Sequence, residues 1–256
     1  MKHGDFTILA EDYSKYRQGY ALSVLHALLG LLGKPAEVCD AVDVGAGTGI
    51  WSRLLAQQNF RSVTAVEPNQ AMRTVGIQDS AGLDITWREG TGENTGLPEA
   101  SADLVSMASS FHWVDFRQGT QEFCRLLRPG GWFVALWNPR YIQKSALLED
   151  IEAELSRLEP GLRRASSGRQ DSWDDLSDRL SERPGFDDVI MLEGRHQVSQ
   201  TVDEYIGAWR SVNDVRVQLG QDKFERFLDY ARRRIGDGPV ETTYLTRAWA
   251  ARRAPA

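Results

Sequence analysis

Residues 41–49 read AVDVGAGTG, an apolar run that breaks into glycines at alternate positions, Gly45, Gly47 and Gly49. A helix-forming run, IWSRLLA over residues 50–56, follows at once. Glycine lets the backbone approach a ligand where a Cβ would collide, and a helix that starts here aims its N-terminus at that ligand. The stretch therefore predicts a strand–turn–helix unit that holds a nucleotide-like ligand.

An acidic residue stands at the end of the next predicted strand. Residues 62–66, SVTAV, form this second apolar run, and Glu67 follows it. In folds of this kind a carboxylate about 20 residues after the first glycine accepts hydrogen bonds from ribose hydroxyls. Together, the glycine turn and Glu67 predict an adenosyl cofactor.

The glycine spacing separates two classes of adenosyl cofactor. The dinucleotide fingerprint G-x-G-x-x-G requires its third glycine where this chain has Ile50. Here the pattern is G-x-G-x-G, and residues 42–49 resemble, position for position, motif I (V/L-D-x-G-x-G-x-G) of the class I methyltransferases that depend on S-adenosylmethionine (SAM). The resemblance implies SAM as cofactor and S-adenosylhomocysteine as product.

Further stretches resemble that family in its own order. These are VEPNQAM at 66–72, REGTGE at 88–93 with Leu97-Pro98, the strand ADLVSMA at 102–108, and LLRPGGWFVAL at 126–136. The resemblance covers nearly the whole chain, with its motifs concentrated before Pro139. It implies an α/β, Rossmann-like, doubly wound mixed sheet of seven strands, mostly parallel with the last strand antiparallel, flanked by helices.

The pattern of elements indicates a single domain over residues 1–256. Residues 1–33 are expected to form an N-terminal helical cap, with Tyr13, Tyr16 and Tyr20 on one helix face. Alternating strand and helix signals over 38–138 indicate the SAM-binding core. Helical insertions at 140–185 and 201–236 are expected to form a lid over the substrate. The last expected elements are strands at 187–193 and 242–249 and helices at 146–155, 202–210 and 222–235.

The resemblance also implies which residues contact the cofactor. Glu67 is expected to bind the ribose diol, with Gly45 and Gly47 beside the ribose and methionyl parts, and Thr91 and the Gly92 N–H at the adenine. Many family members carry Asp where Thr91 stands, so the adenine contact departs from the pattern. Asp43 either orients the glycine turn or caps the strand end. The full set of implied cofactor contacts is Tyr16, Arg17, Gly45, Ala46, Gly47, Glu67, Pro68, Met72, Thr91, Gly92 and Ser109.

The segment after the fourth strand, SSFHWVD at 109–115, bears on the methyl acceptor. It lacks the N/D-P-P-Y sequence of amino-methylating nucleic-acid and glutamine methyltransferases, and the chain has no Pro-Cys pair for a cysteine-dependent mechanism. With Tyr13-x-x-Tyr16-Arg17-x-x-Tyr20 it resembles the small-molecule group that includes trans-aconitate and natural-product O- and N-methyltransferases. A small acceptor methylated at O or N is therefore expected. The acceptor-site residues expected from this are Tyr13, Tyr20, Phe111, Trp113, Trp137 and Tyr141.

Two charged or titratable residues carry open alternatives. His112 is the candidate catalytic base, because an unperturbed imidazole titrates at about pH 6.5, but it can equally shape the pocket through hydrogen bonds. Arg17 suits a carboxylate, either that of the cofactor or that of an acidic substrate, and otherwise lies on a surface helix. Aromatic faces would stabilise the cofactor's sulfonium by about 0.5–2 kcal/mol.

Composition sets the wider limits. The formal net charge is −6, and the basic clusters are short, which excludes the strongly basic face of a nucleic-acid-binding protein. No apolar run is long enough for a membrane span, the N-terminus lacks a signal-peptide core, and two separate cysteines suggest a reducing compartment, so a cytoplasmic location is expected. No His/Asp/Glu spacing suggests a metal site. Two other functions stay open: a non-catalytic SAM-binding scaffold, and an NAD-dependent oxidoreductase, which the glycine spacing disfavours.

Overall fold

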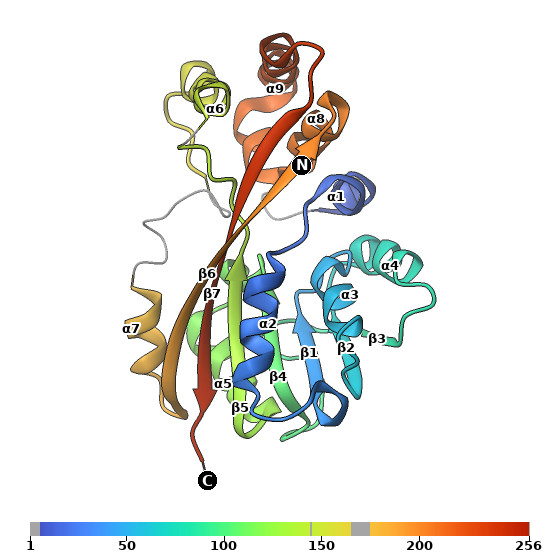
Figure 1. Cartoon of the computed structure of the whole chain (residues 1–256), viewed down its shortest axis with the longest axis vertical. Helices are drawn as coiled ribbons and strands as arrows, with labels where there is room; N and C mark the ends of the chain where they lie inside the picture. The colour runs from blue at the N-terminus through green and yellow to red at the C-terminus, as the bar shows by residue number, and fades with distance from the viewer. Residues whose placement is uncertain (1–5, 144, 165–174, 256) are drawn as a thin grey trace.

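The computed structural model describes residues 6–143, 145–164 and 175–255. Within these ranges seven strands form one sheet in the order β3-β2-β1-β4-β5-β7-β6 (Figure 1). The neighbours run parallel except at β7, which is antiparallel to both β5 and β6. The strands are β1 (Asp40–Val44), β2 (Ser62–Val66), β3 (Ile85–Arg88), β4 (Ala102–Ala108), β5 (Leu127–Trp137), β6 (Phe186–Gln200) and β7 (Val240–Arg253). The Rossmann-like mixed sheet with an antiparallel last strand is confirmed.

The two faces of the sheet bury alternate residues, as the two-residue period of a strand requires. Ala41 and Leu104 face a cluster formed with α2 (Leu22–Leu31) and α3 (Ile50–Ala56). Their neighbours Val42 and Val105 face the opposite cluster, formed with α5 (Phe116–Leu126) and α7 (Leu176–Ser181). Helices on both faces explain why the central strand β4 is apolar almost throughout.

Side-chain caps fix where several helices begin. The Asn69 side chain accepts from the Met72 N–H at the start of α4 (Gln70–Asp79). Asp115 does the same for the Gln118 N–H at the start of α5. Thr201 forms a capping box with Glu204 at the start of α8 (Val202–Arg210). The bounds of α8 are the ones that the sequence predicted.

Three helices form a separate bundle at one end of the molecule. Figure 1 shows α6 (Ala146–Leu158), α8 and α9 (Asn213–Ile235) gathered around the far end of β6 and β7, beyond the other strands. They share their own apolar core, which includes Ile151, Trp209 and Phe227. We call these helices and their connections the lid. Residues 165–174 of the expected lid lie outside the described residues.

Several elements are longer than the sequence pattern predicted. α9 starts nine positions before the predicted residue 222. It consists of two helical stretches on either side of a kink at Gly220 (φ 70°), and the prediction covered only the second stretch. β6 and β7 extend past the core as a two-stranded ribbon that reaches the lid, with pairing that continues to Gln200↔Val240. Short 3-10 turns complete the chain: η1 (Thr7–Leu9), η2 (Ala36–Val38) and η3 (Phe111–Trp113).

The N-terminal segment corrects one prediction, because its tyrosines do not share a helix face. α1 (Ala10–Tyr16) ends at Tyr16, and Arg17 is extended (φ −72°, ψ 135°). The Tyr16 ring packs on α8, where a Cβ built on Gly207 would come within 2.5 Å of it. Tyr20 lies beyond the helix and turns back towards the sheet, where its hydroxyl is 3.0 Å from Ser109 Oγ.

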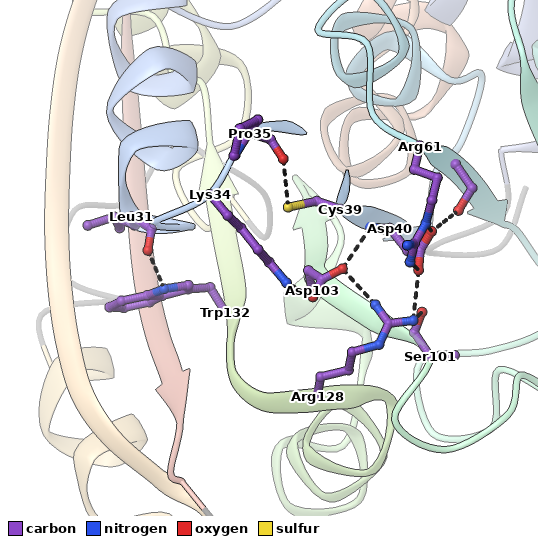
Figure 2. A network of polar contacts seen from close by, with 11 residues as sticks. Leu31, Lys34, Pro35, Cys39, Asp40, Arg61, Ser101, Asp103, Arg128 and Trp132 are labelled. Carbon is purple, nitrogen blue, oxygen red and sulfur yellow. Dashed lines mark hydrogen bonds and ion pairs between the residues drawn. The ribbon is translucent and has the colours of Figure 1, made fainter. Parts of the chain in front are cut away.

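A network of charged residues ties the strands together at their amino-terminal end (Figure 2). Asp103 of β4 accepts from Lys34 Nζ and Arg128 Nη1, each at 2.6 Å, and from the Asp40 N–H at 2.8 Å. Asp40 of β1 also pairs with Arg61 and Arg128. Since ligands of such sheets bind at the carboxyl ends, this network is structural and lies away from the candidate site.

Candidate cofactor and acceptor site

A cavity of about 600 Å³ opens at the carboxyl ends of β1, β2 and β4. Its walls come from the loops that follow these strands, from the N-terminal segment and from the lid. Carboxyl ends of parallel strands meet at one edge of a sheet, which brings residues from distant parts of the chain together. The cavity thus has a strand end and a lid end.

The glycine turn after β1 forms the floor of the strand end. Gly45 and Gly47 have φ values of 64° and 58°, in the left-handed region. A Cβ on Gly45 would lie 2.7 Å from Ser110 Cβ, so this position excludes any side chain. The Ala46 N–H donates to the Val66 carbonyl oxygen at 3.1 Å, which joins the turn to the end of β2.

Glu67 stands at this junction and is 7% exposed. Its Oε2 accepts from the Gly47 N–H and its Oε1 from the Asn69 N–H, each at 2.8 Å. Burial raises the pKa of the carboxyl group. A carboxylate offers about four lone-pair positions, so two backbone donors leave capacity for hydroxyl groups of a ligand.

Asp43 lies beneath the turn and is fully buried. It accepts from Ser52 Oγ of α3 at 2.6 Å, and Ser106 Oγ lies 3.3 Å away. Burial raises the pKa of the Asp43 carboxyl group to about 7. Of the two roles left open by the sequence, the structure supports orientation of the turn, because Asp43 holds the helix that follows it.

The loop after β3 forms one side wall with Thr91 and Gly92. The Thr91 hydroxyl accepts from the Asn94 N–H at 3.2 Å, and the Thr91 N–H donates to the Asn94 carbonyl at 2.9 Å. A Cβ on Gly92 would come within 2.4 Å of Val114. The wall is therefore a closed turn whose backbone approaches the loop after β4.

The loop after β4 faces the N-terminal segment across the cavity. Ser109 holds a left-handed backbone (φ 57°) and its N–H donates to the Leu136 carbonyl at 2.7 Å. The Tyr20 hydroxyl lies 3.0 Å from Ser109 Oγ, and the Tyr20 ring meets Trp51 edge-on at 5.2 Å. Burial raises the pKa of Tyr20, so its hydroxyl stays protonated.

His112 lines the cavity from the η3 turn. Trp137 Nε1–H donates to His112 Nδ1 at 3.4 Å. Because Nδ1 accepts this hydrogen bond, the neutral ring carries its own hydrogen on Nε2. In this arrangement Nε2 is a donor.

Comparison with known proteins agrees with this architecture. Residues 42–135, which contain the turn, Glu67 and the loops just described, match the family model of a methyltransferase domain. Over these residues the chain is similar to a methyltransferase domain.

Relatives of known sequence share this part of the chain. The chain is 33% identical over 128 residues to the uncharacterized methyltransferase Rv3342 of Mycobacterium tuberculosis, a match that covers 50% of this chain and 49% of the relative. It is 36% identical over 115 residues to the dimethylglycine N-methyltransferase of Parasynechococcus marenigrum, covering 43% and 41%. The chain thus spans about half the length of the curated relatives it matches or less.

Solved structures show the same fold over most of the chain. A candidate type II methyltransferase from Anaeromyxobacter dehalogenans superposes with a TM-score of 0.64 at 23% identity, covering 94% of this chain and 100% of that one. The YcgJ protein of Bacillus subtilis reaches 0.51 at 16% identity, covering 90% and 100%. Both likenesses concern the fold alone.

Most residues predicted for the site do line this cavity. Those predicted to contact the cofactor are Arg17, Gly45, Ala46, Gly47, Glu67, Pro68, Met72, Thr91, Gly92 and Ser109. Those predicted for the acceptor side are Tyr13, Tyr20, Trp113 and His112. They come from five separate segments, which the fold brings together.

Four predicted residues are absent from the described lining. Tyr16 packs on Gly207 of the lid instead. Phe111 is buried in the sheet core against Phe123 and Phe133. Trp137 is also in that core and donates a hydrogen bond to His112 of the site. Tyr141 lies under the guanidinium of Arg195 at 4.4 Å. For Phe111 and Trp137 the cause is shared: an aromatic residue at or just after a strand end fills the core as readily as a cleft.

The sequence analysis missed the charged residues at the lid end. Lining residues found there are Arg140, Glu152, Arg164, Asn213, Asp214 and Tyr244. They belong to no motif, and only Arg140 had a positional signal, because it follows the end of β5. Among the described residues, no three His, Cys, Asp or Glu side chains converge as metal ligands would, and no helix is long and apolar enough to cross a membrane.

Proposed function

We propose that this protein is a SAM-dependent methyltransferase that transfers a methyl group to an O or N atom of a small-molecule acceptor. The observation that carries the proposal is the position of Glu67. Its carboxylate is held by the Gly47 and Asn69 N–H groups at the floor of a cavity that continues to the lid. One cavity thereby offers a nucleoside-binding end and a second end for an acceptor.

The strand end has the groups that the nucleoside of SAM requires. Glu67 would accept from the two ribose hydroxyls through the lone pairs that Gly47 and Asn69 leave available. The turn at Gly45 gives the backbone close access to the ligand. Thr91 and Gly92 would face the adenine edge, with Pro68 and Met72 against its plane.

The reaction is an in-line displacement. The acceptor's O or N forms a bond to the methyl carbon while the carbon–sulfur bond breaks, and the sulfur keeps the electron pair to give S-adenosylhomocysteine. The proton of the acceptor's O–H or N–H group passes to solvent water. Alignment of the two reactants can supply about 7–11 kcal/mol of the barrier reduction. Tyr13, Tyr20 and Trp113 lie in the cavity wall, where aromatic faces would stabilise the sulfonium cation.

His112 would act on the acceptor through Nε2, a buried atom that would have to turn towards the acceptor as it binds. A base at this atom would need the other tautomer, in which the Nδ1–H and the Trp137 N–H would point at each other. We therefore propose that His112 orients the acceptor by donating a hydrogen bond from Nε2. Proton removal by His112, which the sequence suggested, requires this hydrogen bond to break and is the alternative.

Calorimetric titration with SAM, S-adenosylhomocysteine, NAD and NADP tests the proposal. Saturable binding of SAM and S-adenosylhomocysteine alone supports it and justifies a screen of acceptors with labelled methyl groups. Binding of NAD or NADP instead would point to an oxidoreductase on the same fold. Binding of SAM with no transfer to any acceptor would favour a scaffold.

A further inference from the structure

The lid end of the cavity is lined by four charged side chains with little exposure to solvent. Arg140 follows β5, Glu152 lies in α6, Arg164 follows α6, and Asp214 lies in the first turn of α9. Their side chains are 11%, 20%, 17% and 4% exposed. Long charged side chains are rarely held this far from water unless they bind other groups.

Arg140 is fixed by both stacking and charge. Its guanidinium carbon lies 3.9 Å from the Trp209 ring centroid and 5.6 Å from that of Tyr205, both on α8. Nη2 is 3.5 Å from Glu152 Oε1. A guanidinium stacked on an aromatic face keeps its N–H donors in its own plane, the geometry that binds a planar or tetrahedral anion through two hydrogen bonds.

Arg164 shares the same acidic partner. Its Nη1 is 3.0 Å from Glu152 Oε2, and its Nε is 3.5 Å from Asp214 Oδ2. Glu152 therefore bridges the two arginines, one through each carboxylate oxygen. All three contacts, at 3.0, 3.5 and 3.5 Å, are longer than the 2.7–2.9 Å of a close charge-assisted hydrogen bond.

A third arginine adds charge without an acidic partner among the described residues. Arg17 donates from Nε to Ser211 Oγ at 2.9 Å and from Nη2 to the Ser211 carbonyl at 3.4 Å. Ser211 directly follows α8, so these contacts place Arg17 at the lid. Three arginines and two carboxylates, those of Glu152 and Asp214, give the described lining of the lid end one net positive charge.

The two ends of the cavity therefore differ in charge. Glu67 and Glu93 line the strand end, where SAM, with its sulfonium, ammonium and carboxylate groups, would bring one net positive charge. Arg17, Arg140 and Arg164 give the lid end the opposite sign. Such a distribution favours a second ligand with a negative group at the lid end.

We infer that the methyl acceptor carries an anionic group, a carboxylate or a phosphate, which Arg140 and Arg164 bind at the lid end of the cavity. The nucleophilic O or N atom would then point away from the lid, towards the methyl group. This inference rests on the proposed function, since it names the class of acceptor for the same site.

Four small probes with one benzene ring test the inference on the full-length protein saturated with S-adenosylhomocysteine. They are benzoate, phenyl phosphate, benzyl alcohol and benzylamine, titrated by calorimetry. We expect benzoate or phenyl phosphate to bind at least tenfold more tightly than benzyl alcohol, a factor that corresponds to about 1.4 kcal/mol. The stronger of the two anions identifies the carboxylate or the phosphate as the preferred group.

Three variants assign the effect to residues. Arg140→Met should weaken binding of the anion at least tenfold, and Glu152→Gln should strengthen it several-fold, because the arginines lose a competing carboxylate. Arg157→Met is the matched control, since Arg157 lies on the outer side of α6 with a side chain 54% exposed and pairs with Asp150 and Glu154. It should bind the anion as the unmodified protein does.

The outcomes separate the two proposals. Failure to bind S-adenosylhomocysteine would refute the proposed function itself. Three results would overturn only the anionic acceptor, provided that S-adenosylhomocysteine still binds. They are a preference for benzylamine, no saturable binding of either anion, and an anion affinity in Arg140→Met equal to that of the unmodified protein. Retained S-adenosylhomocysteine binding by Arg140→Met shows that this variant is folded, and Arg140→Lys provides a second test in which the charge stays and the stacked, two-donor geometry is lost.

Discussion

The carboxylate of Glu67 accepts a hydrogen bond from the backbone N–H of Gly47 at 2.8 Å, so the acidic residue after β2 and the glycine turn after β1 form one unit. The contact is possible because Gly47 adopts a left-handed backbone (φ 58°) that turns its N–H towards the neighbouring strand end. Residues that the sequence separates by a whole strand–helix unit therefore present a single surface to the ligand.

Replacing Glu67 by Ala should weaken binding of S-adenosylhomocysteine by roughly 1.5–3 kcal/mol, the range for hydrogen bonds to a charged group. Calorimetry gives this number directly. Glu89→Ala is the control, because the Glu89 side chain is 75% exposed and pairs only with Arg73 among the contacts described for it. Equal affinities in the two variants would remove Glu67 from the binding site.

Gly47→Ala and Gly130→Ala form a matched pair. Both glycines have positive φ, 58° and 79°, so both substitutions carry a similar backbone strain of about 1–3 kcal/mol. A Cβ at Gly130 has no neighbour within 4 Å, whereas a Cβ at Gly47 projects at the cavity floor, 3.3 Å from Met72 Cε. We expect similar losses of thermal stability and a loss of cofactor binding only in Gly47→Ala. Full binding by both would contradict the assignment of the turn.

Substitutions of His112 distinguish a hydrogen-bond donor from a base. A Gln side chain can donate from its amide but cannot remove a proton at neutral pH. If His112 orients the acceptor, His112→Gln should keep most of the turnover that His112→Ala loses. If His112 is the base, both variants should lose roughly 10²–10⁴-fold in kcat. Single-turnover rates with labelled SAM, once an acceptor is found, measure the difference.

Asp43 should make stability depend on pH. Its folded pKa of about 7 exceeds the value of about 3.9 for an unfolded Asp, so between these values the folded protein holds a proton that the unfolded chain releases. The free energy of unfolding should therefore fall as the pH rises from 4 to 7, by at most about 1.4 kcal/mol for each pH unit. Asp43→Asn should remove this component. Urea unfolding of both proteins across the window is the measurement, and parallel curves would show that Asp43 does not titrate there.

Asp103→Ala should affect stability and leave the ligand site intact. Asp103 accepts from Lys34 and Arg128 at 2.6 Å, at the end of the sheet opposite the cavity (Figure 2). Its loss should lower the free energy of unfolding by roughly 1.5–3 kcal/mol, with no change in affinity for S-adenosylhomocysteine. Lys34→Met removes a partner that is 44% exposed, and should cost less than about 1 kcal/mol. A change in affinity in Asp103→Ala would mean that the two ends of the sheet are coupled.

The local pattern was sufficient for the first half of the domain. The strands at 62–66 and 102–108 have the bounds that the sequence predicted, and in the second half of the chain the helix at 202–210 does as well. The glycine turn, Glu67, Thr91 and Ser109 also line the cavity as predicted. Such features can be predicted from the sequence because each depends on a short segment. The turn needs left-handed glycines, and the end of a parallel strand places the next residue at the site.

The aromatic residues show where prediction from the local sequence fails. Tyr13 and Tyr20 reach the cavity, while Tyr16 packs on Gly207, because the chain leaves the helix at Arg17 and changes direction. Phe111 and Trp113 are two positions apart, yet one fills the sheet core and the other lines the site. Hydrophobicity favours burial in either place, and only the direction of the backbone selects between them.

What the sequence alone determined is the predicted class of cofactor site, because each of its signals, such as the glycine turn or the acidic residue at a strand end, lies within one strand–loop unit. What only the tertiary structure decided is the charge of the lid end, where Arg17, Arg140, Arg164, Glu152 and Asp214 come from four separate segments. Coulomb interactions depend on distance in space and on burial, and neither is encoded in the spacing of these residues along the chain.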